Sequence, residues 1–209
     1  VAMRRCWLAA GACALLTVLP VTAARHALLV GNSTGGPGNQ DLKYVKNDLE
    51  QMRDVLTTAC GFAGRRVAVL YNVDRAALRA RLQQFGEALL GNDDDLFLFY
   101  YSGHADDSAL RMGGERFSLV ELKSLLGSLP ARIRVALFDA CQSGSFTRLK
   151  GGTLAEPFLF ASDTKVEGYV VLSSSAAHEN SQESDALQHS VFTFHVVNAL
   201  RGSADASGD

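Results

Sequence analysis

The sequence contains little proline or cysteine and no excess of one charge. Its 209 residues include 4 Pro and 4 Cys, and 47% of them are hydrophobic. This composition excludes a collagen-like, low-complexity or disulfide-dense chain, and the length predicts one domain with a sizeable core. The 20 basic residues against 22 acidic ones give a formal net charge of -2. Nucleic-acid binders usually carry a basic excess, so we expect no nucleic-acid partner.

The motifs of phosphate-binding loops and of common metal sites are also missing. The glycine-rich residues 31–38 lack the Gly-Lys-Ser/Thr ending of a phosphate loop and the spacing of a dinucleotide fingerprint. The His and Cys positions do not have metal-ligand spacing. Acidic residues at 93–95, at 106–107 and at Glu115 do not assemble into a recognisable calcium site. We therefore expect no cofactor, and a requirement for calcium is left open as the alternative.

Residues 1–24 have the composition of a secretion signal. Arg4 and Arg5 precede an uncharged, mostly apolar run over residues 7–19, and small residues surround Ala23. The apolar run is shorter than the roughly 20 residues that a helix needs to span a bilayer. We predict cleavage after Ala23, no stable membrane span, and a secreted or periplasmic location. A retained anchor is the alternative.

The four cysteines separate into two pairs by position. Cys6 and Cys13 lie in the signal segment, and Cys13 would carry the lipid if the chain were a lipoprotein. Cys60 and Cys141 remain in the mature chain. In an oxidising compartment these two could form a disulfide, but the position of Cys141 suits a free nucleophile better.

The rest of the chain alternates between strand-like and helix-like patterns. Short continuous apolar runs indicate strands buried on both faces, and apolar residues at three- and four-residue spacing indicate amphipathic helices. This alternation predicts an α/β domain with a mainly parallel sheet. We expect strands at residues 26–30, 66–71, 96–101, 133–138 and 169–172, a β-ribbon over 109–117, and helices that begin at 41 and 74 or span 119–126 and 191–200.

Two of the expected strands are followed by residues suited to nucleophilic catalysis. His104 follows the third strand after Ser102 and Gly103, and Cys141 follows the fourth strand after Asp139. Ligands bind at the carboxyl ends of strands in open α/β sheets, where neighbouring strands lie about 4.8 Å apart. A histidine beside a thiol raises its nucleophilicity or orients the proton transfer. The remaining histidines lack this context, and we expect them to be structural: His26, His178, His189 and His195.

Both segments resemble the catalytic motifs of caspase-like cysteine peptidases, the clan of caspases, metacaspases and bacterial relatives. Tyr-Tyr-Ser-Gly-His at 100–104 resembles the motif of the catalytic histidine, and Phe-Asp-Ala-Cys-Gln-Ser-Gly at 138–144 resembles that of the catalytic cysteine. The resemblance implies a three-layer α/β fold with a mainly parallel sheet of about six strands flanked by helices. Further similar segments are Leu-Leu-Val-Gly-Asn at 28–32, Asn-Asp at 47–48, Val-Leu-Ser-Ser-Ser at 171–175 and Val-Phe-Thr-Phe at 191–194.

The resemblance implies a cysteine endopeptidase that acts on peptide or protein substrates. Cys141 would be the nucleophile that forms a thioester, and His104 would be the general base and acid. The backbone N–H groups of Ala105 and Cys141 would form the oxyanion hole. The family usually has Gly where this chain has Ala105, which bears on the geometry of the hole. The alternative is therefore a non-catalytic caspase-like module that binds peptides or proteins.

Two acidic residues suggest which peptide bonds would be cleaved. Caspases cut after Asp and have Gln two residues before the catalytic cysteine, where this chain has Asp139, and Asp48 falls where metacaspases place a second acidic residue. Two carboxylates in the pocket for the residue before the cleaved bond (P1) would favour Arg or Lys. We expect Ser102 and Ser173 to line the same pocket. The other interpretations are that Asp139 caps the turn after its strand and that Asp48 faces solvent.

These assignments divide the chain into three parts. We expect a signal peptide over residues 1–24, a peptidase domain over 25–202, and at 203–209 the start of a segment that continues beyond this sequence. Residues 146–168 contain basic residues, so an Arg- or Lys-directed peptidase could cut itself there. The other interpretation of that stretch is an exposed loop.

Overall fold

A five-stranded parallel sheet forms the centre of the fold, with strand order β2-β1-β3-β6-β7. The computed structural model describes residues 23–91, 95–140, 168–174 and 182–205. In this described part of the chain the main sheet has five strands where about six are expected. The strands are β1 (Arg25–Asn32), β2 (Val67–Tyr71), β3 (Leu96–Gly103), β6 (Ile133–Asp139) and β7 (Gly168–Ser173), with two hairpins, β4 (Ala109–Met112) with β5 (Glu115–Ser118) and β8 (Glu183–Ser184) with β9 (His189–Ser190).

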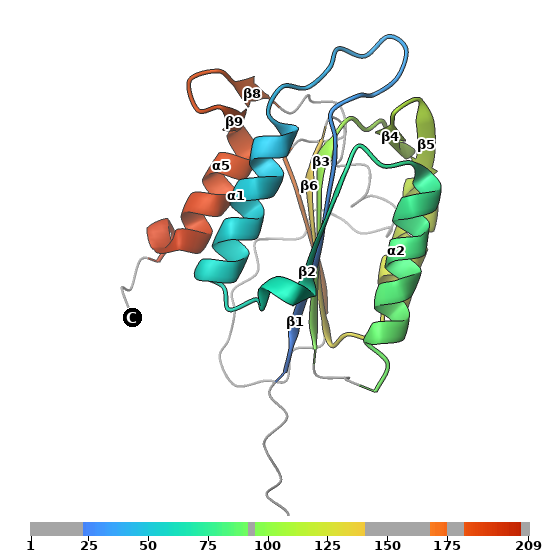
Figure 1. Cartoon of the computed structure of the whole chain (residues 1–209), viewed down its shortest axis with the longest axis vertical. Helices are drawn as coiled ribbons and strands as arrows, with labels where there is room; N and C mark the ends of the chain where they lie inside the picture. Colours follow the sequence, from blue (N-terminus) through green and yellow to red (C-terminus); the bar gives the residue numbers. More distant parts are fainter. Residues whose placement is uncertain (1–22, 92–94, 141–167, 175–181, 206–209) are drawn as a thin grey trace, which may run out of the picture.

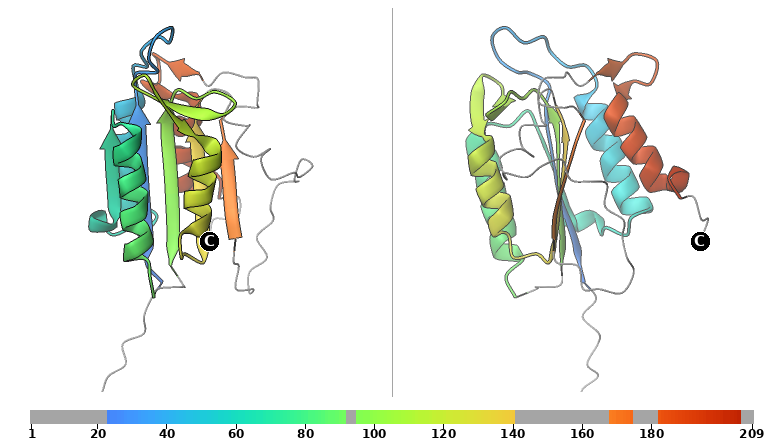
Figure 2. Two further views of the ribbon diagram at one scale, coloured as in Figure 1. Left: turned by 90° about the vertical axis from the view of Figure 1, so that its right-hand side faces the viewer. Right: turned by 180° about the vertical axis from the view of Figure 1, so that it is seen from behind.

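Helices cover both faces of the sheet, which gives three layers (Figure 1). The helices α1 and α5 pack on one face, and α2 and α3 pack on the other, as both views of Figure 2 confirm. The predicted α/β class and three-layer architecture are therefore confirmed. The helices are α1 (Val45–Thr58), α2 (Arg75–Ala88), α3 (Leu119–Ser128) and α5 (Val191–Asn198), with short turns η1 (Gly64–Arg66) and η2 (Ala199–Ser203).

The sequence of β1 shows why the sheet needs helices on both sides. Ala27 and Leu29 pack in the core beneath α1 and α5, whereas Leu28 and Val30 pack in the core beneath α2 and α3. All four side chains are fully buried. Because successive residues of a strand point to opposite faces, a continuous apolar run places a hydrophobic surface on each side of the sheet.

The beginning of α1 differs from the sequence prediction. The apolar spacing predicts a helix from Asp41, but the helix begins at Val45. The backbone N–H of Leu42 donates to the carbonyl of Ser33, and those of Lys43 and Tyr44 donate to the Glu183 carboxylate. These amides are held by acceptors from distant parts of the chain, so residues 42–44 stay outside the helix. The next helix begins where the sequence predicts it, and Asp74 is its N-cap, since the Asp74 carboxylate accepts from the Ala77 N–H at 2.7 Å.

The parallel arrangement brings the carboxyl ends of all five strands to one edge of the sheet. The loop before α1, the β4–β5 hairpin and the β8–β9 hairpin surround this edge, which is uppermost in Figure 1. Among the described residues, no helix is both long and apolar enough to cross a membrane. The carboxyl edge is the place where α/β folds of this type bind ligands.

Candidate active site

Two aspartates from different elements meet just below the carboxyl ends of the strands. Asp48 lies in the first turn of α1 and Asp139 ends β6, and their exposed fractions are 1% and 3%. Ser102 on β3 is the register partner of Asp139, and its hydroxyl donates to Asp48 Oδ2 at 3.2 Å. The structure thus brings three of the predicted pocket residues together. The alternative in which Asp48 faces solvent is wrong.

The start of α5 supplies further partners to both carboxylates. The backbone N–H of Ser190 donates to Asp48 Oδ1 at 3.1 Å, while its hydroxyl donates to Asp139 Oδ2. The Thr193 hydroxyl also donates to Asp139 Oδ2, at 2.6 Å, and His189 Nδ1 lies 3.1 Å from Asp48 Oδ1. Ser190 therefore connects the two aspartates, one through its backbone and the other through its side chain.

These three residues of the β9–α5 junction had no assigned place in the predicted site. The sequence predicts a structural role for His189, and the roles of Ser190 and Thr193 are visible only in the structure. A local signal does exist, because Ser190 is the N-cap of α5 and accepts from the Thr193 N–H at 3.0 Å. Sequence spacing can predict this cap. It cannot show that the cap lies on carboxylates contributed by α1 and β6.

Burial and like charge shift the ionisation of Asp48. Burial is the larger cause and the neighbouring Asp139 charge the second, and together they raise the pKa of Asp48 to about 7. The N–H of Ser190 and the hydroxyl of Ser102 oppose this shift. Burial, with the charge of Arg201, lowers the pKa of His189, so its neutral form is favoured. A cation that entered this site would relieve the repulsion between the carboxylates and lower the pKa of Asp48.

His104 follows β3 at the same edge of the sheet, and its ring is held by the loop before α1. Its Nε2 lies 2.8 Å from the carbonyl oxygen of Gln40. A carbonyl can only accept, so Nε2 carries a proton and Nδ1 of the neutral ring is an acceptor. A Cβ on Gly35 would lie 2.7 Å from the ring, and a Cβ on Gly103 would lie 2.8 Å from the carbonyl of Asn32. Both glycines are therefore needed for the close approach of these segments.

The backbone around Ala105 is compatible with an alanine. Among the described residues, the only non-glycine residues with positive φ are Asn72 and Gln188, so Ala105 has an ordinary backbone conformation. Ala105 and Leu110 form an antiparallel β-bridge, and its hydrogen bonds are made by the flanking residues. One of these hydrogen bonds runs from the Arg111 N–H to the His104 carbonyl. The bridge itself leaves the Ala105 N–H unused.

Cys141, the second predicted catalytic residue, lies outside the described residues. The register pairs Ser102 with Asp139, and His104 and Cys141 each follow two residues later in the chain. Ala140, the last described residue before the cysteine, is buried, and its N–H donates to the Ser174 hydroxyl at 3.2 Å. The signal segment before residue 23, most of the 146–168 stretch and His178 also lie outside the described residues.

Ser173 lies on the opposite face of the sheet from the aspartate pair. It is the register partner of Phe138 on β6, and the Phe138 side chain packs in the core beneath α2 and α3. Paired residues of neighbouring strands share a face of the sheet. Asp139 is the next residue along β6 and belongs to the other face, where Asp48 lies.

Residues 31–35 read Gly-Asn-Ser-Thr-Gly, a pattern that also occurs at the nucleophile elbow of serine hydrolases. In that elbow the serine joins a strand directly to a helix. Here a loop separates β1 from the start of α1 at Val45. The Ser33 hydroxyl donates to Asn72 Oδ1 at 3.1 Å. The segment therefore does not form an elbow.

Comparison with known proteins assigns the fold that carries this site. A sequence model of the caspase domain matches residues 24–207. This chain belongs to the caspase family. The crystal structure of caspase-1 from Spodoptera frugiperda resembles it with a TM-score of 0.64 and 18% sequence identity, over 86% of this chain and 69% of that chain. No curated protein sequence matches this chain.

Membership of the caspase family confirms the resemblance stated from the sequence motifs. Caspase domains are cysteine peptidase domains, so the substrate class is a peptide or a protein. The structural likeness to the insect caspase, at this level of identity, establishes the shared fold.

Proposed function

We propose that this caspase-family chain is a cysteine endopeptidase that cleaves peptide bonds after Arg or Lys. The observation that carries the proposal is the meeting of two buried carboxylates, Asp48 and Asp139, at the carboxyl edge of the sheet, the edge at which β3 leads into His104. Burying two like charges together is unfavourable unless a counter-charge compensates them. A guanidinium or ammonium group of the substrate would supply that charge.

In the proposed reaction, Cys141 attacks the carbonyl carbon of the scissile bond. His104 Nδ1 takes the thiol proton, because Nε2 is already bonded to the Gln40 carbonyl. The protonated ring then delivers this proton to the leaving amine as the carbon–nitrogen bond breaks and the thioester forms. Water hydrolyses the thioester and releases the carboxylic acid. The N–H groups of Ala105 and Cys141 would stabilise the oxyanion.

In the proposed P1 pocket, Asp48 and Asp139 bind the cationic end of the side chain. The hydroxyl of Ser102 holds Asp48 Oδ2, and Ser190 holds the two carboxylates at a fixed spacing. When a cation binds, it favours the ionised form of Asp48 and so lowers the pKa of that residue. An acidic P1 side chain would add a third negative charge and would be rejected.

The test is a set of fluorogenic peptides that differ only at P1, with Arg, Lys or Asp. The parent should hydrolyse the Arg and Lys peptides and not the Asp peptide, and Cys141→Ala and His104→Ala should abolish turnover. Asp139→Asn should lower kcat/KM for the Arg peptide roughly 100-fold, as expected when one member of a buried charge pair is removed. Asp41→Asn, which changes an exposed carboxylate in the loop before α1, is the matched control and should leave kcat/KM unchanged.

The same assay decides the alternative of a non-catalytic binding module. That alternative is motivated by Ala105, but the ordinary φ of this residue removes a conformational reason for inactivity. If the parent shows no turnover and Cys141→Ala changes nothing, the peptidase proposal is lost. Binding of an uncleaved Arg peptide under those conditions would establish the module instead.

We also propose that the enzyme needs no metal and acts after export. Within the described residues, no group of three or more His, Cys, Asp or Glu side chains could hold a metal ion. We expect the activity to be the same with a calcium chelator and with added calcium. Stimulation by calcium would contradict the proposal.

The proposal of export rests on the signal-like segment before Ala24, and it is checked by recovering the protein outside the cytoplasm.

A further inference from the structure

The end of the sheet opposite the active site holds the residue that follows the cleavage site predicted after Ala23. Ala24 is buried, immediately before β1, and both of its backbone groups are engaged. Its N–H donates to Asp95 Oδ1 at 2.7 Å, and its carbonyl accepts from the Leu96 N–H at 2.9 Å. Ala23, one residue earlier, is exposed. The chain thus passes from solvent to a buried, fully bonded position between these two alanines.

The acceptor of the Ala24 N–H is a buried carboxylate, that of Asp95. Its exposed fraction is 5%, and its other oxygen, Oδ2, lies 3.2 Å from His26 Nε2. Burial lowers the pKa of His26 against the opposing effect of Asp95, and the Arg66 charge lowers it further, so the imidazole tends to be neutral. A buried carboxylate held by two neutral donors lacks the full compensation that a cation provides.

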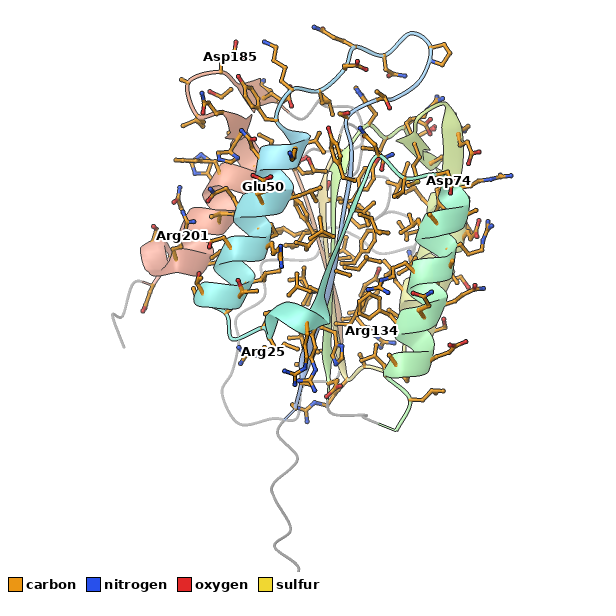
Figure 3. The ribbon with its side chains drawn as sticks, in the orientation of Figure 1. Arg25, Glu50, Asp74, Arg134, Asp185 and Arg201 are labelled. Atoms are coloured by element: carbon orange, nitrogen blue, oxygen red, sulfur yellow. The ribbon has the colours of Figure 1, made fainter. Side chains whose placement is uncertain are left out.

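The arginines labelled at this end of Figure 3 are directed to backbone carbonyls. Arg25 donates to the carbonyl of Cys60, and Arg134 donates to the carbonyl of Gly127 at 2.7 Å. The contacts of the Asp95 carboxylate that the structure describes come from Ala24 and His26.

We propose that cleavage of the peptide bond between Ala23 and Ala24 creates an amino terminus whose ammonium group forms an ion pair with Asp95. In this hydrolysis water adds across the bond, Ala23 leaves with the carboxyl group, and the nitrogen of Ala24 gains the protons of an ammonium ion. The nitrogen is already at hydrogen-bond distance, so the pair needs no movement of the chain. Departure of the exposed Ala23 opens the other ammonium protons to water.

The geometry also selects this bond over its neighbour. Signal peptidases accept small residues, and both alanines satisfy that requirement. A cut after Ala24 would remove the nitrogen that reaches Asp95 and the carbonyl that pairs with Leu96. Only a cut after Ala23 converts an existing hydrogen bond into an ion pair.

The first test uses the full chain, exported by its own signal and carrying Cys141→Ala so that it cannot cut itself. Mass spectrometry of the exported protein should find Ala24 as the first residue. A first residue of Arg25, or an intact leader, would overturn the proposal. This test does not depend on the proposed peptidase activity.

The second test measures the ion pair by thermal unfolding. A matched variant has Gly-Ser inserted between Ala23 and Ala24, so that the same cut leaves two extra residues and the Ala24 nitrogen stays an amide. At neutral pH the parent should have a Tm higher by about 3 °C or more. This advantage should disappear when both proteins also carry Asp95→Asn, and should persist with the exposed Glu87→Gln as control. Equal Tm values for parent and insertion variant would refute the ion pair.

The pH dependence gives a readout that does not need Asp95→Asn to fold. An α-amino group has an ordinary pKa of about 7.7–8.0, and a buried carboxylate beside it raises that value in the folded state. The stabilisation is therefore complete below about pH 7 and is lost as the pH rises through the raised value. Asp95, His26 and Arg66 face this group in both proteins, so the difference between them reports the amine. A Tm difference that stays constant to about pH 11 would contradict the proposal.

Discussion

At the scale of single residues, Ser190 carries two structural roles at once. It caps α5 by accepting from the Thr193 N–H, and its hydroxyl donates to the buried Asp139 carboxylate. Ser190→Ala removes both interactions. Loss of a cap costs about 1 kcal/mol, and loss of a hydrogen bond to a charged group costs roughly 1.5–3 kcal/mol. We expect a decrease of about 2–4 kcal/mol in the free energy of unfolding, measured with urea.

The matched control for this prediction is Ser118→Ala. Ser118 is the N-cap of α3, where it accepts from the Glu121 N–H at 3.5 Å. That substitution removes only a cap, so its cost should be about 1 kcal/mol or less. If the two variants are destabilised equally, the hydroxyl of Ser190 does not stabilise Asp139.

The raised pKa of Asp48 predicts that the stability depends on pH with a sign that is unusual for a carboxylate. Its pKa is about 7 in the folded protein, against an ordinary value of 3.8. Between these values the folded state keeps a proton that the unfolded state has released. The contribution of Asp48 to the free energy of unfolding therefore falls as the pH rises from about 4 to about 7. Asp48→Asn removes this contribution, so the variant should gain stability relative to the parent across that interval.

Three other groups face this carboxylate, namely Asp139, Glu183 and His189. They are present in parent and variant, so the quantity to follow is the difference between the two urea-unfolding curves at each pH. A difference that is constant from about pH 4 to 8 would show that Asp48 keeps an ordinary pKa. Binding of an Arg substrate should follow the ionised form, so KM of the parent should rise as the pH falls below about 7.

At the scale of elements, the β8–β9 hairpin is fastened to the beginning of α1. The Glu183 carboxylate accepts from the backbone N–H groups of Lys43 and Tyr44 at 3.1 and 2.9 Å. This places a negative charge at the N-terminus of α1, where the helix dipole favours it. The same hairpin carries His189 and leads into Ser190, both partners of Asp48. Its attachment therefore positions one wall of the proposed P1 pocket.

Glu183→Ala should loosen this attachment. We expect KM for the Arg peptide to rise several-fold with a smaller change in kcat, because Glu183 takes no part in the proposed chemistry of His104 and Cys141. The control is Asp185→Ala in the same hairpin, labelled in Figure 3. In the described part of the chain, the Asp185 carboxylate accepts from the Lys43 ammonium and the Tyr44 hydroxyl in exposed contacts, and exposed pairs contribute little. An equal rise in KM for both variants would argue against a specific role of Glu183.

At the scale of the whole molecule, the sequence predicts the elements better than it predicts the site. Strands and helices follow from apolar spacing, which is local, and the motifs around His104 and Asp139 indicate the family. The contact of His189 with Asp48 joins residues 141 positions apart in the chain. The face on which Ser173 lies follows from register with β6. Neither the contact nor the face can be predicted from the local spacing of residues, so both become visible only in the folded chain.

The order of the sheet also predicts how stability is distributed over the molecule. β1 and β3 each have a strand on both sides, and Val30, Phe99 and Tyr100 are fully buried. In the described part of the chain, β7 has a neighbour only on one side, and Leu172 is 48% exposed. Amides of β1 and β3 should therefore exchange with solvent only through global unfolding, whereas those of β7 should exchange through local opening.

Native-state hydrogen exchange followed by mass spectrometry measures this difference directly. Low urea concentrations should accelerate exchange in β1 and β3 and leave exchange in β7 nearly unchanged, because global unfolding exposes far more surface than local opening. Equal protection of β7 and β3 would mean that another segment completes the sheet beside β7. His104 follows β3, so we expect the rigidity of that strand to hold the histidine at a fixed position while the proposed P1 pocket binds substrate.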